Sequence, residues 1–116
     1  MLIAALLLNG CSRYTQDETR VIRHMHTIQK AEDVYYEANN RYAALAELDG
    51  LIDRRLVRGV SDGYAFTVVP GKSDYTLIAK PRVWNVDGQW SFFSDESKII
   101  VTWTEREATR KSPVLR

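Results

Sequence analysis

The chain has 116 residues, which is enough for one domain with a hydrophobic core. Lysine and arginine total 16 against 15 for aspartate and glutamate, and the net charge of +1 gives no electrostatic basis for binding nucleic acid. The single cysteine excludes an intrachain disulfide, so packing must hold the domain together.

The first eleven residues resemble a bacterial lipoprotein signal. An apolar run, Leu2–Leu8, is followed by Asn9, Gly10 and the only cysteine, Cys11. We predict that residues 1–10 are a signal segment, that Cys11 carries a lipid, and that residues 11–16 form a polar tether. Such a protein is expected in the bacterial cell envelope, anchored to the membrane on its periplasmic or extracellular side.

These residues have a second interpretation, because no basic residue precedes the apolar run as it does in an ordinary signal peptide. They are then the end of a longer helix whose start lies upstream of Met1. The apolar residues present before Asn9 are by themselves too few to cross a bilayer, which needs about 20 residues.

An amphipathic helix is predicted from about Asp17 to Ala38, and the pair Asn39-Asn40 is expected to end it. Apolar residues recur there at spacings of three and four: Val21, Met25, Ile28, Ala31, Tyr35 and Ala38. The opposite face is expected to meet solvent and carries Arg20, Arg23, Gln29, Lys30 and Asp33.

Residues 41–59 are rich in alanine and leucine and are interrupted by Gly50 and Gly59, which predicts two short helical turns joined by a bend. After Gly59 the apolar period changes to two, which predicts strands over residues 64–69 and 75–84. Further strands are expected over about 90–93 and 98–103, and residues 104–116 are expected to be a charged, solvated tail.

The dipeptide Asp87-Gly88 predicts a two-residue hairpin turn between the strands on either side of it. In that register Val83 faces Phe92, and the side chains of Trp84 and Trp90 point to opposite faces of the sheet. The predicted fold over residues 17–103 is α+β, with the N-terminal helix packed on an antiparallel sheet of about four strands.

Five sequence segments resemble the soluble head of type IV pilins and type II secretion pseudopilins. They are TIQKAEDVYY (27–36), NNRYAALAEL (39–48), DGYAFT (62–67), YTLIAKP (75–81) and SFFSD (91–95), in the same order as in the family. The resemblance covers about residues 18–102. It implies a pilin-like head with a structural or protein-interaction role, and pilin or secretion-system subunits as partners.

The N-terminus departs from the pilin pattern. Pilins of this family have a leader cut after glycine, then phenylalanine, an early glutamate and a long apolar helix, whereas here Gly10 is followed by CSRYT. Lys98 also stands where many relatives have glycine. The sequence therefore predicts a pilin-like head on a lipid anchor, or the head of a split system in which a separate short pilin supplies the apolar helix.

No constellation of residues in the sequence points to catalysis, a cofactor or a metal, and we expect a protein that is not an enzyme. His24 and His26 are two residues apart on the helix, so their side chains diverge by about 200° and cannot share one ion. The carboxylates Glu32, Asp33 and Glu37 are expected to be solvated helix charges, since no partner for acid–base chemistry is evident.

Aromatic residues gather in the last third of the chain and suggest a contact surface. Trp84 and Phe93 are the candidates for it, because aromatic side chains on the outer face of a sheet often form contacts with partners. An alternative function from a different class follows: a periplasmic lipoprotein that binds a glycan or peptide ligand on this aromatic face.

Overall fold

The computed structural model of the protein describes residues 15–104 and 106–115. Cys11, the signal segment and most of the tether lie outside these residues. Along the chain come the helix α2 (Gln16–Asn39), the 3-10 turn η1 (Leu45–Leu48) and the short helix α3 (Arg54–Val57). The strands β1 (Val60–Ser61), β2 (Tyr64–Pro70), β3 (Tyr75–Pro81), β4 (Trp90–Asp95) and β5 (Val101–Thr104) follow.

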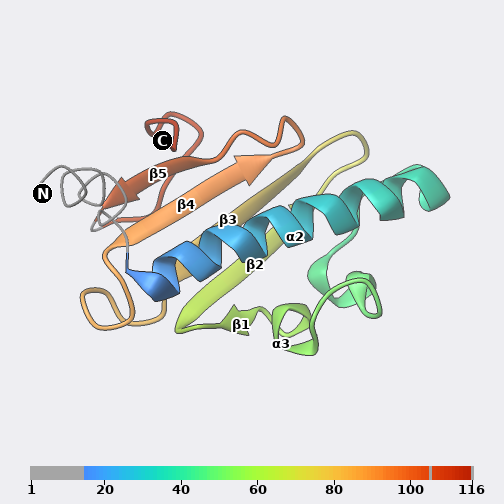
Figure 1. Ribbon diagram of the computed structural model, residues 1–116. Helices are drawn as coiled ribbons and strands as arrows, with labels where there is room; N and C mark the ends of the chain where they lie inside the picture. Colours follow the sequence, from blue (N-terminus) through green and yellow to red (C-terminus); the bar gives the residue numbers. More distant parts are fainter. Residues whose placement is uncertain (1–14, 105, 116) are drawn as a thin grey trace, which may run out of the picture.

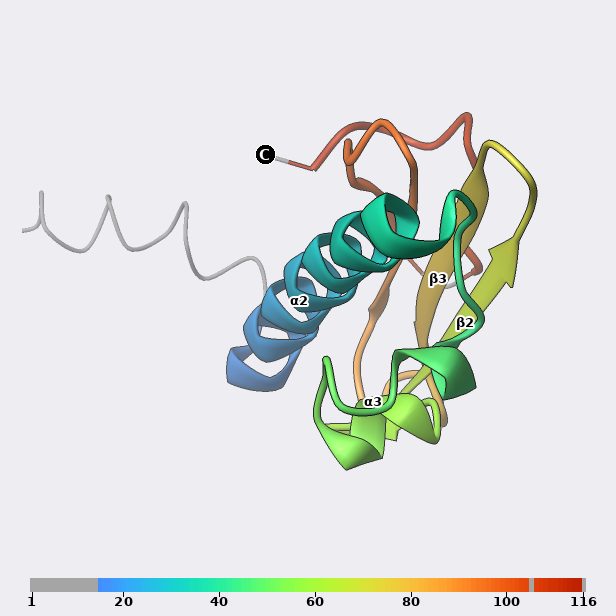
Figure 2. The same ribbon diagram turned by 90° about the vertical axis from the view of Figure 1, so that its right-hand side faces the viewer.

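The strands form one antiparallel sheet in which each strand pairs with its neighbours in the sequence, in the order β1-β2-β3-β4-β5. Helix α2 lies across one face of this sheet (Figures 1 and 2). The predicted α+β class is confirmed, with five strands instead of about four. The additional strand is β1, which pairs with the start of β2 through Ser61 and Tyr64.

Helix α2 begins with a capping box and ends in a left-handed residue. The Thr15 hydroxyl accepts a hydrogen bond from the Glu18 backbone N–H, and the Glu18 carboxylate accepts one from the Thr15 backbone N–H. At the other end Asn40 has a φ of 57°, a conformation that asparagine tolerates. The predicted helix limits are therefore confirmed to within a residue or two.

The core lies between α2 and the sheet. Four of the six apolar helix residues predicted to face the core are buried: Val21, Met25, Ile28 and Ala31. They meet alternate residues of the strands, including the buried side chains of Tyr64, Phe66, Tyr75, Leu77, Ala79 and Phe92. Tyr35 is half-buried and Ala38 is exposed, because the end of the helix extends past the core.

Gln29 and Glu32 were expected on the solvated side of the helix, and both expectations are wrong. Gln29 is 3% exposed, and its amide nitrogen donates to the Ser94 hydroxyl at 2.7 Å. Glu32 is fully buried, and its carboxyl accepts the Ala43 backbone N–H at 2.7 Å. Each polar side chain is buried because a partner distant in sequence satisfies at least one of its polar atoms.

The hairpin register predicted around Asp87-Gly88 is also wrong. Strand β3 ends at Pro81, Phe92 pairs with Ala79, and residues 82–89 form a longer loop. A two-residue turn forms at another Asp-Gly pair, where Asp62 and Gly63 both have positive φ, 54° and 78°, and join β1 to β2. In loop 82–89 the Asp87 carboxylate accepts the Val83 backbone N–H instead of serving a tight turn.

Most residues of the C-terminal segment, 106–115, are exposed, but the segment lies against the sheet instead of extending freely into solvent. Ala108 is 1% exposed and packs with Phe93, Val101 and Ile78 on the sheet face opposite α2. The segment then pairs with the edge of β5, where the Val101 and Val114 backbones form an antiparallel bridge. The buried Ala108 and the backbone contacts with β5 attach the segment to the sheet.

Candidate functional site

The two residues predicted to form a contact surface lie in different parts of the structure. Phe93 lies in the middle of β4, opposite Ile78 of β3, with its side chain on the sheet face away from α2. Trp84 lies in loop 82–89, beyond the end of β3, where it is half-buried. The structure therefore does not join them into one aromatic patch.

The C-terminal segment covers Phe93. Only 8% of Phe93 is exposed, and the Arg110 guanidinium lies over its ring at 5.3 Å from the centroid. Arg110 also forms an ion pair with Asp95 at the end of β4. Burial alone would raise the pKa of the Asp95 carboxyl, but hydrogen bonds from Ser97 and the Arg110 charge together hold it below its usual value.

A hollow of about 230 Å³ lies where the C-terminal segment meets β4 and β5. Its lining combines apolar side chains with the Arg110–Asp95 pair: Phe93, Ile99, Val101 and Val114 beside Asp95, Ser97, Arg110 and Ser112. Ile99 and Val114 are about half exposed. A second hollow of about 240 Å³ lies beside Trp103, whose ring is 5.9 Å from the Arg106 guanidinium carbon.

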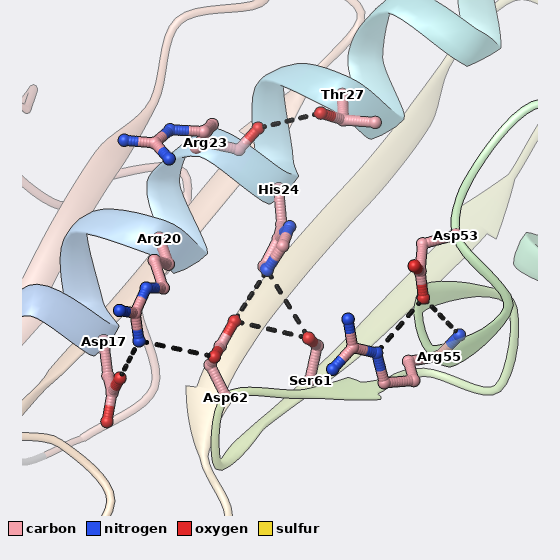
Figure 3. A network of polar contacts seen from close by, with 9 residues as sticks. All are labelled: Asp17, Arg20, Arg23, His24, Thr27, Asp53, Arg55, Ser61 and Asp62. Atoms are coloured by element: carbon pink, nitrogen blue, oxygen red, sulfur yellow. Dashed lines mark hydrogen bonds and ion pairs between the residues drawn. The ribbon is translucent and has the colours of Figure 1, made fainter.

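A polar cluster joins α2 to the turn between β1 and β2 (Figure 3). His24 Nε2 lies 2.7 Å from the Asp62 carboxylate and 3.4 Å from the Ser61 hydroxyl. Burial tends to raise the pKa of Asp62, but the hydrogen bonds of His24 and Ser61 and the charges of His24 and Arg20 together lower it.

This serine, histidine and aspartate do not form a catalytic triad. In a triad the serine hydroxyl bonds to one imidazole nitrogen and the carboxylate to the other. The carboxylate fixes the tautomer and orientation of the ring, which then accepts the proton of the hydroxyl. Here both oxygens meet the same nitrogen, Nε2, and the carboxylate and hydroxyl also contact each other at 3.3 Å. The cluster ties the helix to the sheet.

Glu18 makes a second, more extensive connection between α2 and the rest of the fold. Its side chain is 1% exposed, and one carboxylate oxygen accepts the Gln89 N–H at 2.7 Å and the Trp90 N–H at 3.1 Å. The Tyr64 hydroxyl also lies 3.2 Å from this oxygen. The start of the helix is thereby fixed to the end of loop 82–89.

Glu32 is a fully buried carboxyl group in the core. Burial raises its pKa to about 7 against the opposing effect of the Ala43 N–H, and the negative charges of Glu47 and Asp33 add to the rise. Its second oxygen and the buried Tyr75 hydroxyl have no hydrogen-bond partner. Both atoms lie inside the core, out of reach of a substrate, so the raised pKa bears on stability.

Among residues 15–104 and 106–115, no group of three potential ligands is placed to hold a metal ion. His26 hydrogen-bonds Gln29, and His24 faces Asp62, so the two histidines serve different contacts. Within the same residues, no helix has the length and apolar character required to cross a bilayer.

No protein-family model, curated protein or solved structure matches the chain. The candidate surfaces are therefore assigned from geometry alone. The sequence did not predict the hollow lined by Phe93 and Arg110, because the charged composition of residues 106–115 gives no sign that this segment packs on the sheet. Apolar residues at Ala108, Val114 and Leu115 were the only available signal.

Proposed function

We propose that the protein is a non-enzymatic, pilin-like or pseudopilin-like component of the bacterial cell envelope. Its role is structural or protein-binding, in a type IV pilus or a type II secretion-like system. The supporting observation is the arrangement of α2, which lies along an antiparallel sheet of sequentially connected strands and presents its opposite side to solvent. This is the arrangement that the sequence resemblance implies for a pilin head.

The exposed side of α2 is the surface on which subunit contact is expected. It carries Arg23, Thr27, Lys30 and Glu37, together with Val34, whose side chain is about half exposed. Val34 is the apolar side chain on this side that a partner subunit could cover.

A genetic experiment tests the role. In the bacterium that encodes the chain, deletion of its gene is expected to reduce surface filaments or the secretion of folded exoproteins, and the wild-type gene is expected to restore them. A photoreactive amino acid at Val34 is expected to cross-link to a pilin or secretion-system subunit, whereas one at Val69, an exposed valine of β2, is not. Normal filaments and secretion in the deletion strain, with no such cross-link, would contradict the proposal.

Membrane anchoring through Cys11 is part of the proposal and has its own test. Cells grown with a clickable fatty acid are expected to label the wild-type protein and not the Cys11→Ser variant. Equal labelling of the two proteins would exclude lipid attachment at Cys11.

The alternative, a ligand-binding lipoprotein with an aromatic sheet face, receives less support from the fold. The C-terminal segment lies over Phe93, and Trp84 is on a separate loop. Titration of the intrinsic tryptophan fluorescence with candidate glycans tests it, with Trp84→Phe as the control.

A further inference from the structure

Loop 82–89 exposes apolar side chains at its tip. Val86 is 77% exposed and Val83 is 53% exposed, and between them lies the half-buried Trp84. Arg82, at the start of the loop, is exposed as well. An arginine, a tryptophan and two valines make a small surface that is apolar at its tip and charged at its base.

Hydrogen bonds hold both ends of the loop at the end of the molecule where α2 begins. Glu18, in the first turn of α2, accepts backbone hydrogen bonds from Gln89 and Trp90, and these fix one end of the loop. At the other end, the Arg82 backbone N–H donates to the Gly63 carbonyl at 2.9 Å. Figure 1 shows the start of α2 and the loop between β3 and β4 at the same end, with the β2–β3 turn at the opposite end.

The proposed lipid site is close to this end along the chain. Cys11 precedes Thr15, the N-cap of α2, by four residues, which span at most about 14 Å when fully extended. A membrane that holds the Cys11 lipid therefore lies within that distance of the helix start, on the side of the molecule that carries the loop.

The charges around the loop are compatible with a lipid surface. Of the carboxylates at this end, Asp17 pairs with Arg20 at 2.9 Å and Asp62 meets His24, while Glu18 and Asp87 accept hydrogen bonds from backbone N–H groups. Tryptophan prefers the boundary between lipid and water, and arginine interacts favourably with anionic head groups. Exposed valines gain free energy when they leave water for the acyl region.

We propose that loop 82–89 inserts Val86, Val83 and Trp84 into the surface of the membrane that holds the N-terminal anchor. This contact would fix the orientation of the head, with the start of α2 toward the lipid and the β2–β3 turn away from it. The inference rests on the proposed membrane anchoring and adds to it a second, non-covalent contact.

The experiment compares two exposed valines at opposite ends of the sheet. Val86→Cys and the matched control Val69→Cys, 77% and 58% exposed, are each labelled with the polarity-sensitive fluorophore NBD in the full chain, with the unsubstituted chain as the labelling blank. The proteins are reconstituted with vesicles of phosphatidylethanolamine and phosphatidylglycerol, with or without brominated acyl chains. We expect the label at position 86 to shift to shorter wavelength and to be quenched by the brominated lipid, and the label at position 69 to do neither.

Tryptophan fluorescence provides a second measurement without a label. Quenching by brominated lipid is expected to fall in Trp84→Phe and to persist in Trp103→Phe. Chains that sediment with vesicles but show no quenching at position 86 or Trp84 would overturn the loop contact and leave the anchor standing. Equal quenching at positions 86 and 69 would also overturn the proposed orientation, and chains that do not sediment with vesicles would contradict both the anchor and the loop contact.

Discussion

The Glu18 carboxylate accepts the backbone N–H of Gln89 at 2.7 Å, across 71 residues of sequence. The same side chain closes the capping box with Thr15, so one residue both starts α2 and fixes it to the end of loop 82–89. Local and long-range structure at this end of the molecule therefore depend on one buried side chain.

Glu18→Ala is expected to destabilise the domain by about 3 kcal/mol, because it leaves the Gln89 and Trp90 N–H groups without their acceptor in a partly buried site. Urea denaturation followed by circular dichroism measures the effect. The matched control is Glu37→Ala, on the exposed side of the same helix, which is expected to change stability by less than about 0.5 kcal/mol. Similar losses in the two variants would show that the Glu18 contacts contribute little.

The raised pKa of the buried Glu32 carboxyl is expected to appear in the pH dependence of stability. Its folded-state pKa is raised from 4.5 to about 7, so the folded protein binds a proton more tightly than the unfolded chain between these values. Stability should then fall as the pH rises from about 4.5 to 7, by up to about 3 kcal/mol, and level off above that range.

Glu32→Gln retains an oxygen for the Ala43 N–H and removes the charge. The variant should match the wild type near pH 4.5 and be the more stable protein above pH 7. Denaturation curves over this pH range, with Glu37→Gln as the exposed control, make the comparison. A stability difference between Glu32→Gln and wild type that does not vary with pH would contradict the assignment.

Asp62 should have the opposite pH dependence, because His24, Ser61 and Arg20 together lower its folded-state pKa despite partial burial. Its contribution is present above the unfolded pKa, about 3.9, and is lost as the pH falls through the lower folded value. Asp62→Asn preserves the turn, since asparagine also accepts a φ of 54°. We expect it to cost about 1 kcal/mol at pH 6 and progressively less toward pH 3, measured by thermal unfolding. Asp49→Asn, at an exposed site, is the control.

The contact between the C-terminal segment and the sheet is expected to depend on Ala108. Ala108→Asp places a charge where the side chain is 1% exposed, against Phe93 and Val101, and should displace the segment. Binding of the dye ANS should increase as these apolar residues become accessible, and the Leu115 amide should lose protection from hydrogen exchange. Ala46→Asp, at an exposed alanine in η1, should leave both signals unchanged.

The helix and the class of fold could be predicted because their signals are local. The spacing of Val21, Met25, Ile28 and Ala31 defines one helical face, and the alternation from Tyr64 to Val68 defines a strand. Gln29 could not be placed in this way, because the group that permits its burial, Ser94, is 65 residues away. The hairpin prediction was wrong for a related reason. Three Asp-Gly pairs, at residues 49–50, 62–63 and 87–88, carry the same turn signal, and the pairing of the strands decides which of them forms a hairpin turn.

The candidate surfaces were harder to predict than the fold. Phe93 alternates correctly to the sheet face opposite α2, but its exposure depends on residues 106–115, whose composition indicates solvent. Trp84 was assigned to a strand, and its position in a longer loop follows from the end of β3 at Pro81. Alternation predicts which side of a sheet a residue occupies and does not predict what covers that side.

The pairing of the C-terminal segment with β5 has a consequence for self-association. The Thr102 N–H donates to the Pro113 carbonyl and the Leu115 N–H donates to the Ile100 carbonyl, so the chain's own end occupies part of the last strand's edge. If the edge of β5 were uncovered, its free backbone N–H and C=O groups could pair with a strand of another molecule. Proteolytic cleavage after Arg110 or Lys111 would remove the residues that pair with β5. The exposed strand edge would then be a site at which molecules can aggregate.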